Sequence, residues 1–268
     1  MKSNTIPAII LLILSFSVNA QQDTMYVMKN GEVVKKYNVE TEIDSITFHN
    51  PEAQEPENTF TDPRDGTVYK TVTIGDQVWM AENLKYLPDV VGPKTRSYTE
   101  PYHYVYDYDG ESIEDAKAMA IYYTYGVLYN WPAAMNEAES STDNPSGVQG
   151  ACPAGWHVPS NDEWMELSDY LGGSLVAGSP LKETGDIRWR SPNADATNET
   201  GFTARPGGYL ATTNSGEFNN LGRSGYWWSA TQGTDVDAFR MSMIYSRSNL
   251  YFGGKYKIMA ASVRCVKD

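Results

Sequence analysis

Two cysteines, Cys152 and Cys265, place the tightest constraint on how this chain can fold. An even number of cysteines in an exported chain favours one disulfide over two free thiols. The bond would close a loop of roughly 110 residues, and in the loop-entropy account such closure stabilises a fold by about 4 to 5 kcal/mol. We therefore expect a fold whose middle is tied covalently to its end.

The first 20 residues predict the export that such a disulfide requires. Lys2 is followed by an apolar run from Ile6 to Val18 that contains no acidic residue. This pattern is typical of a secretory signal peptide, and the run is too short to span a bilayer stably. We expect cleavage after Ala20 and a mature protein that is secreted or held at the cell envelope, without a membrane span.

The chain is strongly acidic, with a formal net charge of −13. Loss of the single positive charge of Lys2 with the signal peptide changes −13 to −14. A surface of this charge repels phosphate backbones and anionic lipids, which excludes nucleic acid as a partner.

The mature chain is predicted to consist of a small β unit at 21–49, a linker at 50–61 and a main domain at 62–268. In the β unit, Asn30-Gly31 separates two apolar runs. This is typical of a hairpin, because both turn positions need positive φ. A further strand is expected at 43–48.

The main domain is predicted to be α+β, with antiparallel strands, few helices and long loops. Strands at 68–74 and 77–80 predict a second hairpin. The pattern from Ser160 to Glu163 matches the S-x-x-E capping box that begins a helix. Short apolar or aromatic runs then predict strands at 201–204, 208–210, 225–229, 239–243 and 261–266. Strands followed by helices and more strands are typical of this class.

Several sequence segments of the main domain resemble those of one known family and occur in the same order. They are Trp79-Met80-Ala81-Glu82-Asn83-Leu84, Tyr125-Gly126-Val127-Leu128-Tyr129-Asn130-Trp131, Cys152-Pro153-Ala154-Gly155-Trp156-His157-Val158-Pro159-Ser160, Tyr226-Trp227-Trp228-Ser229-Ala230-Thr231 and Ser262-Val263-Arg264-Cys265-Val266-Lys267-Asp268. They resemble the Fibrobacter succinogenes major paralogous domain family, which is found in exported proteins of Bacteroidetes and Fibrobacteres. The resemblance covers most of residues 62–268.

This resemblance implies a C-type-lectin-like fold, which the family shares with the formylglycine-generating sulfatase-modifying enzymes. In that fold a bridge commonly joins a helix region to the last strand, which suits Cys152 and Cys265. The fold hosts many functions, so it identifies no ligand.

No catalytic set is predicted. The formylglycine-generating relatives depend on a reactive cysteine pair, but a structural disulfide accounts for the same two residues. His49, His103 and His157 are scattered and lack zinc-site spacing. Asp107 and Asp109 could hold calcium in a loop, yet no lectin calcium motif accompanies them, so no metal or other cofactor is predicted.

Alternating tyrosines form the most suggestive binding feature. On a strand, Tyr102, Tyr104, Tyr106 and Tyr108 would share one face, and exposed rings can stack on sugars or anchor a protein. The alternative is that this face is buried. Of two adjacent tryptophans, one points outward, and we take Trp228 as a second candidate ligand residue.

The sequence thus predicts an exported, non-enzymatic binding or display module at the bacterial cell surface, with a polysaccharide or a protein as its ligand. One alternative is a structural subunit of a surface fibre or adhesin, assembled through the edge of the N-terminal β unit. Another is a thiol-dependent enzyme related to the formylglycine-generating enzymes.

Overall fold

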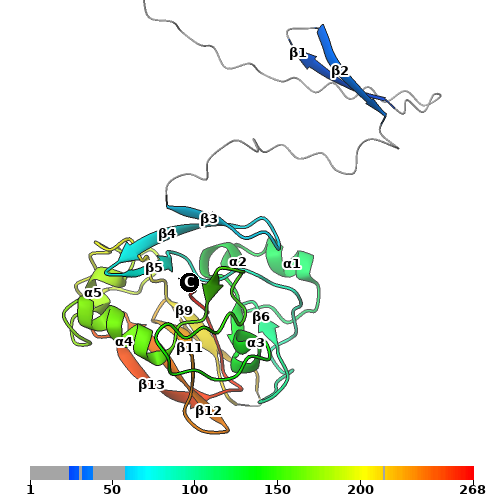
Figure 1. The fold of residues 1–268 in the computed structure, drawn as a ribbon. Helices are drawn as coiled ribbons and strands as arrows, with labels where there is room; N and C mark the ends of the chain where they lie inside the picture. The colour runs from blue at the N-terminus through cyan, green and yellow to red at the C-terminus, as the bar shows by residue number, and fades with distance from the viewer. Residues whose placement is uncertain (1–23, 30–31, 39–57, 214) are drawn as a thin grey trace, which may run out of the picture. The chain divides into compact units, whose positions relative to one another are not determined.

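The computed structural model describes residues 24–29, 32–38, 58–213 and 215–268. Contacts divide the chain into two units, Met1–Gln54 and Glu55–Asp268, and each is described by itself (Figure 1). The predicted signal peptide, the predicted strand at 43–48 and most of the predicted linker lie outside the described residues. In the part of the chain that is described, no helix has the length and apolar composition needed to cross a bilayer.

The first unit contains a β-hairpin. β1 (Thr24–Lys29) and β2 (Glu32–Asn38) pair antiparallel, which confirms the hairpin predicted around Asn30-Gly31. Val33 and Val34 of β2 are 45% and 56% exposed. A two-stranded hairpin with its valines in solvent buries little apolar surface by itself.

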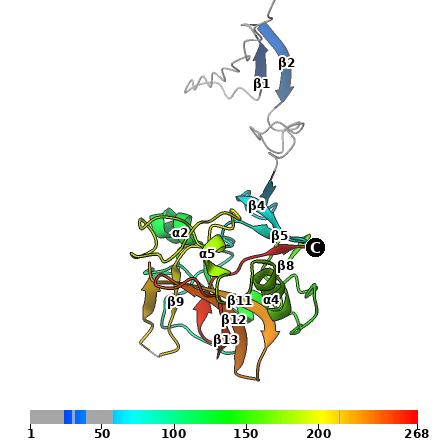
Figure 2. The ribbon, with the colours of Figure 1, turned by 90° about the vertical axis from the view of Figure 1, so that its left-hand side faces the viewer.

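The strands of the second unit form three sheets. Their bounds are β3 (Thr59–Thr61), β4 (Val68–Ile74), β5 (Gln77–Met80), β6 (His103–Tyr104), β7 (Leu128–Asn130), β8 (Trp156–His157), β9 (Gly207–Leu210), β10 (Phe218–Leu221), β11 (Ser224–Gln232), β12 (Asp237–Ile244), β13 (Tyr251–Tyr256), β14 (Ala260–Ala261) and β15 (Val266–Lys267). The sheet orders are β3-β4-β5-β15-β8, β10-β9-β14-β7-β6 and β11-β12-β13. β4 and β5 lie at the opposite end of this unit from β12 and β13 in both views (Figures 1 and 2).

Five short helices complete the described part of the second unit. They are α1 (Ile113–Ala118), α2 (Ala120–Tyr125), α3 (Trp131–Met135), α4 (Asn161–Tyr170) and α5 (Gly178–Leu181). All pairings between the named strands of this unit are antiparallel, so the predicted α+β class with few helices is confirmed.

The capping box at the start of α4 is also confirmed. Ser160 Oγ accepts a hydrogen bond from the Glu163 amide at 3.1 Å, and the Glu163 carboxylate accepts one from the Ser160 amide at 2.9 Å. Two backbone donors at the helix start, which have no partner within the helix, are thereby satisfied.

Two predicted boundaries are wrong. The linker ends before residue 61, because Thr59–Thr61 form β3 and pair with β4. The segment 201–204 is not a strand: Phe202 is fully buried, and only Ala204 makes a bridge, with Lys182. Here the apolar pattern reflects a ring inserted into the core rather than pairing with a neighbouring strand.

The predicted strand at 261–266 is divided between two sheets. β14 pairs with β7 and β9, whereas β15 pairs with β5 and β8. Between them, the Ser262 carbonyl accepts from the Trp228 amide and the Val263 carbonyl accepts from the Leu84 amide. The last ten residues therefore connect elements from the whole of the second unit.

Two hydrophobic clusters enclose the β11-β12-β13 sheet. Trp227 lies in one cluster with Met241 and Met243, and Trp228 lies in the other with Ala238. Adjacent residues of a strand point to opposite faces, so the neighbouring tryptophans enter different clusters. Both faces of this sheet are thus covered where the tryptophans lie.

The disulfide between Cys152 and Cys265 is present, which confirms the predicted pairing. The S–S distance is 2.05 Å, and the two Cα atoms are 6.0 Å apart. Both residues are fully buried in the cluster that contains Trp228. The bond ties the segment that precedes β8 to the C-terminal segment across a sequence separation of 113 residues.

We expect the paired substitution Cys152→Ser with Cys265→Ser to lower the free energy of unfolding by about 4 kcal/mol, because a long loop is no longer closed in the unfolded chain. Urea unfolding of both proteins measures this difference. Thiol labelling is the control: the native protein should take up no label, and the reduced, denatured protein should take up two. Labelling of the native protein would contradict the assignment.

Candidate functional site

The alternating tyrosines do not form an exposed face, so the predicted ligand surface at Tyr102, Tyr104, Tyr106 and Tyr108 is wrong. Tyr104 is fully buried and Tyr106 is 8% exposed, while the other two are half-buried. The chain is a strand only at His103–Tyr104, and Asp107 adopts a φ of 60°. The side chains therefore do not alternate along one continuous strand.

The buried tyrosines, Tyr104 and Tyr106, are part of the hydrophobic core. Tyr104 Oη donates to the Thr95 carbonyl at 2.7 Å, and the Tyr106 ring packs on Phe218 with centroids 4.9 Å apart. A tyrosine that buries its ring gains apolar contact and keeps its hydroxyl satisfied by such an acceptor. The alternative that this face is buried therefore holds for both residues.

Trp228 is fully buried, so its assignment as an outward ligand residue is also wrong. Its Nε1 donates to the Tyr129 carbonyl at 2.8 Å, and Trp227 Nε1 donates to Asn83 Oδ1 at 2.8 Å. The two tryptophans do point to opposite faces of β11. Neither reaches solvent, because a hydrophobic cluster lies on each face.

His157 forms a buried clamp at the start of α4. Its Nε2 lies 2.7 Å from Glu163 Oε1, and its Nδ1 lies 2.7 Å from Asp268 Oδ1. Burial lowers the pKa of His157, but the hydrogen bonds and negative charges of Glu163 and Asp268 outweigh burial and raise it above 6.5. The imidazole is 2% exposed, so it holds the helix start against the C-terminus and lies out of reach of a ligand.

We expect His157→Gln to lower the free energy of unfolding by about 3 kcal/mol at pH 6, because it leaves the buried Glu163 carboxylate without its cationic partner. A raised folded pKa adds stability that is fully present below the unfolded pKa of about 6.5 and is lost as the pH rises through the folded pKa. The difference between wild type and variant, measured by urea unfolding, should therefore shrink from pH 6 to pH 9. A difference that grows with pH would contradict this assignment.

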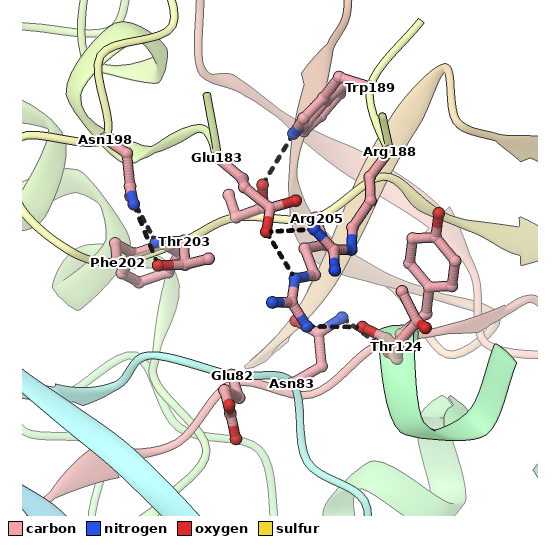
Figure 3. Close-up of polar contacts among 12 residues, drawn as sticks. Glu82, Asn83, Thr124, Glu183, Arg188, Trp189, Asn198, Phe202, Thr203 and Arg205 are labelled. Atoms are coloured by element: carbon pink, nitrogen blue, oxygen red, sulfur yellow. Dashed lines mark hydrogen bonds and ion pairs between the residues drawn. The ribbon is translucent and has the colours of Figure 1, made fainter. Parts of the chain in front are cut away.

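A polar network holds the long segment that follows α5 (Figure 3). Glu183 Oε1 lies 3.0 Å from Arg188 Nη1 and 3.1 Å from Arg205 Nε, and Arg205 Nη1 donates to the Thr124 carbonyl at 3.0 Å. Figure 3 shows Arg205 reaching from Glu183 to Thr124 at the end of α2. Arg188 and Arg205 donate to protein acceptors here, so the network holds this segment against the domain.

A second polar centre is fully buried around Arg264. Its Nη1 donates to the carbonyls of Met80 and Phe202 at 3.0 and 2.7 Å, and its Nη2 donates to Asn83 Oδ1 at 2.8 Å. Burial lowers the pKa of Arg264. A guanidinium enclosed by protein carbonyls joins the C-terminal segment to β5, and no substrate can reach it.

Surface depressions are the remaining candidates. The first, of about 640 Å³, lies along α4 and the β4–β5 turn and is lined by Ile74, Gly75, Asp76, Gln77, Asn144, Asp162, Met165, Glu166, Asp169 and Tyr170. Four of these residues are carboxylates and none is a cation. Its amides from Gln77 and Asn144 are already hydrogen-bonded to Glu166. This acidic groove offers few donors to a ligand.

The second depression, which we name the tyrosine hollow, has a volume of about 450 Å³. It is lined by Tyr209, Ala211, Thr212, Thr213, Asp237, Gly254, Lys255, Tyr256 and Met259. It combines two aromatic rings with a carboxylate, an ammonium group and two hydroxyls. Small-molecule sites characteristically combine apolar walls with a few polar groups in this way.

The β12–β13 pairing builds one wall of the tyrosine hollow. Asp237 lies opposite Tyr256 in the antiparallel register, which sets a carboxylate beside a tyrosine that is 51% exposed. A Cβ at Gly233 would overlap Asp237 Oδ1, and one at Gly254 would lie 3.5 Å from it. Glycine at 233 therefore leaves the space that the carboxylate occupies.

Arg96 joins two segments beside the hollow. Its Nη1 donates to the Thr213 carbonyl at 2.9 Å and its Nη2 donates to the Ile258 carbonyl at 3.0 Å, so one guanidinium joins two loops. Nearby, the ring of Tyr98, which is 41% exposed, meets the ring of Tyr256 edge to face with centroids 6.3 Å apart. The exposed ring is thus held by a neighbour before any ligand arrives.

Sequence reasoning missed the residues of the tyrosine hollow because they come from three separate segments, 209–213, 237 and 254–259. One signal was available: the run from Tyr251 to Tyr256 places Gly253-Gly254 between aromatic residues. Glycine within a strand often marks close approach by a ligand or another backbone. Within the described residues, no group of three or more His, Cys, Asp or Glu side chains is placed to hold a metal ion.

Comparison with known proteins identifies the class of this chain. The sequence profile of the Fibrobacter succinogenes major domain matches residues 72–267, which is more than half of the chain. The chain therefore belongs to the Fibrobacter succinogenes major domain family. No curated protein and no solved structure matches it.

Proposed function

We propose that this chain is an exported, non-enzymatic binding module that holds a polysaccharide in the tyrosine hollow. The observation that carries the proposal is Tyr256, which exposes half of its surface beside Asp237, Lys255 and the hydroxyls of Thr212 and Thr213. Sugar rings have apolar faces that stack on aromatic rings, and their hydroxyls both donate and accept hydrogen bonds. The hollow presents a partner for each of these features.

Export is supported by two independent features. The N-terminal run from Ile6 to Val18 has the composition of a signal peptide. The disulfide between Cys152 and Cys265 suits an oxidising compartment. Together they favour a site of action at the cell surface or in the surrounding medium.

Binding without catalysis is supported by the state of the polar groups. The two cysteines are joined and fully buried, whereas thiol chemistry needs an accessible thiolate. Lining residues of the tyrosine hollow include no histidine, cysteine or serine. The hollow thus has groups that orient a ligand, and its residues do not form the pairing of nucleophile and base that acyl or thiol chemistry uses.

We expect Tyr256→Ala to weaken binding of the recognised polysaccharide about 10-fold, which corresponds to about 1.4 kcal/mol, because a central aromatic contact is lost. Calorimetry against a panel of soluble neutral and acidic polysaccharides measures the effect. The matched control is Tyr123→Ala, which removes a tyrosine that is 62% exposed on α2.

Three outcomes of that experiment are distinct. Loss of binding with Tyr256→Ala and retention with Tyr123→Ala supports the proposal. Loss with Tyr170→Ala instead would move the ligand to the acidic groove. Failure of the wild-type protein to bind any polymer of the panel would overturn polysaccharide recognition.

A second candidate function, assembly into a surface fibre, is favoured by one observation. The β1–β2 hairpin exposes Val33 and Val34, and exposed valines on a short sheet favour pairing with another chain. This proposal concerns the first unit alone and is compatible with ligand binding by the second.

If the hairpin assembles, the mass of the mature protein should rise with concentration, and deletion of residues 21–58 should abolish that rise. Light scattering coupled to size-exclusion chromatography at micromolar and near-millimolar concentrations measures the change. Val33→Thr with Val34→Thr is the milder variant, since it keeps β-branched residues and removes apolar surface. A strictly monomeric wild-type protein contradicts assembly.

A further inference from the structure

Cations lie in and beside the tyrosine hollow, although the chain as a whole carries a net charge of −13. The cations are Arg96, Arg240, Lys255 and Lys257. Within the part of the chain that is described, none of them forms a salt bridge: Arg96 binds carbonyls, Arg240 binds the Ser242 hydroxyl and Lys257 binds the Gln232 amide oxygen. Proteins rarely bury part of a charge without an opposite charge nearby.

Arg240 is the most informative of these residues. Its guanidinium lies over the Tyr226 ring at 4.8 Å, and Tyr226 meets Tyr209 of the hollow with ring centroids 5.0 Å apart. Its Nε is buried and has no hydrogen-bond partner. Burial lowers the pKa of Arg240.

The β-sheet register places Arg240 on the same face as Lys255. Arg240 lies opposite Gly253, and Ala238 lies opposite Lys255, so the two positive side chains are neighbours along one face of β12 and β13. A Cβ at Gly253 would meet nothing within 4 Å. Gly253 therefore leaves open space opposite Arg240, on the side of Lys255.

We propose that the ligand of the tyrosine hollow is an acidic polysaccharide, whose sugar carboxylate binds beside Lys255 and Arg240 in the hollow that Tyr256 also lines. The inference rests on the proposed function and names its ligand class. A carboxylate supplies the charge opposite to that of Arg240 and Lys255, and arginine binds carboxylates through two parallel hydrogen bonds. The ion pair would form in a partly desolvated place, where it is stronger than in water.

The acidity of the whole chain does not oppose this ligand. At physiological salt, charges more than about 8 Å apart are largely screened when they face solvent. None of the residues that line the acidic groove also lines the tyrosine hollow. Asp237 is the one carboxylate among the lining residues of the hollow, and Lys255 balances its charge.

The test compares acidic polymers with the same polymers after their charge is removed. The probes are polygalacturonate, alginate and hyaluronan, each measured by calorimetry beside its carboxyl-reduced form. We expect at least one acidic polymer to bind wild-type protein 10-fold or more tightly than its reduced form, with affinity that falls as salt rises. Arg240→Gln should remove that preference and leave binding of the reduced form unchanged.

Two further variants guard the result against misfolding. Lys255→Gln changes an exposed lining residue. It should weaken binding of the acidic polymer severalfold, and this result does not depend on whether Arg240→Gln unfolds the sheet. Arg247→Gln removes the same charge from an exposed arginine at the β12–β13 turn, outside the hollow, and should change nothing. Thermal unfolding of each variant identifies any that fail to fold.

The failures of the two proposals are distinguishable. Equal binding of acidic and reduced polymers, lost with Tyr256→Ala but unaffected by Arg240→Gln and Lys255→Gln, would overturn acidic recognition and leave polysaccharide binding intact. Absence of binding to any polymer would overturn both.

Discussion

The C-terminal segment is the constraint on which the rest of the second unit depends. Within ten residues it pairs with two different sheets through β14 and β15, and Cys265 bonds it covalently to Cys152. Arg264 adds hydrogen bonds to β5 and to the segment around Phe202, and Asp268 meets His157 at the start of α4. Elements far apart in sequence are thus fastened to one short stretch of chain.

This arrangement explains how a unit with many short strands holds a defined surface. The three-stranded sheet is enclosed by two clusters, and its β12–β13 edge is therefore a firm support for Asp237, Lys255 and Tyr256. Arg96 fixes the loops beside the hollow by binding two carbonyls. A recognition site that is held before its ligand arrives loses less conformational entropy on binding.

The two depressions differ in charge. The acidic groove gathers four carboxylates without a cation, whereas arginines and lysines lie in and around the tyrosine hollow. A chain with a net charge of −13 therefore has a local region suited to an anion. Net charge predicts long-range repulsion, but it does not predict what one desolvated site binds.

Local chemistry made several features predictable. The S-x-x-E pattern at Ser160 sets two hydrogen bonds within one helical turn, and the hairpin of β4 and β5 follows from a glycine turn between two apolar runs. The disulfide followed from a count of two cysteines in a chain predicted to be exported. The capping box and the hairpin depend on residues close in sequence, and two cysteines allow only one pairing within the chain.

What the sequence determined by itself was the class of the domain, its family, the start of α4 and the pairing of Cys152 with Cys265. Only the tertiary structure decided which aromatic residues meet solvent. Tyr104, Trp228 and Tyr256 are all aromatic residues. Neighbours from distant segments cover Tyr104 and Trp228, whereas Tyr256 stays exposed at the edge of a sheet. Exposure is a property of three-dimensional packing, because each ring is covered or uncovered by residues that sequence distance does not reveal.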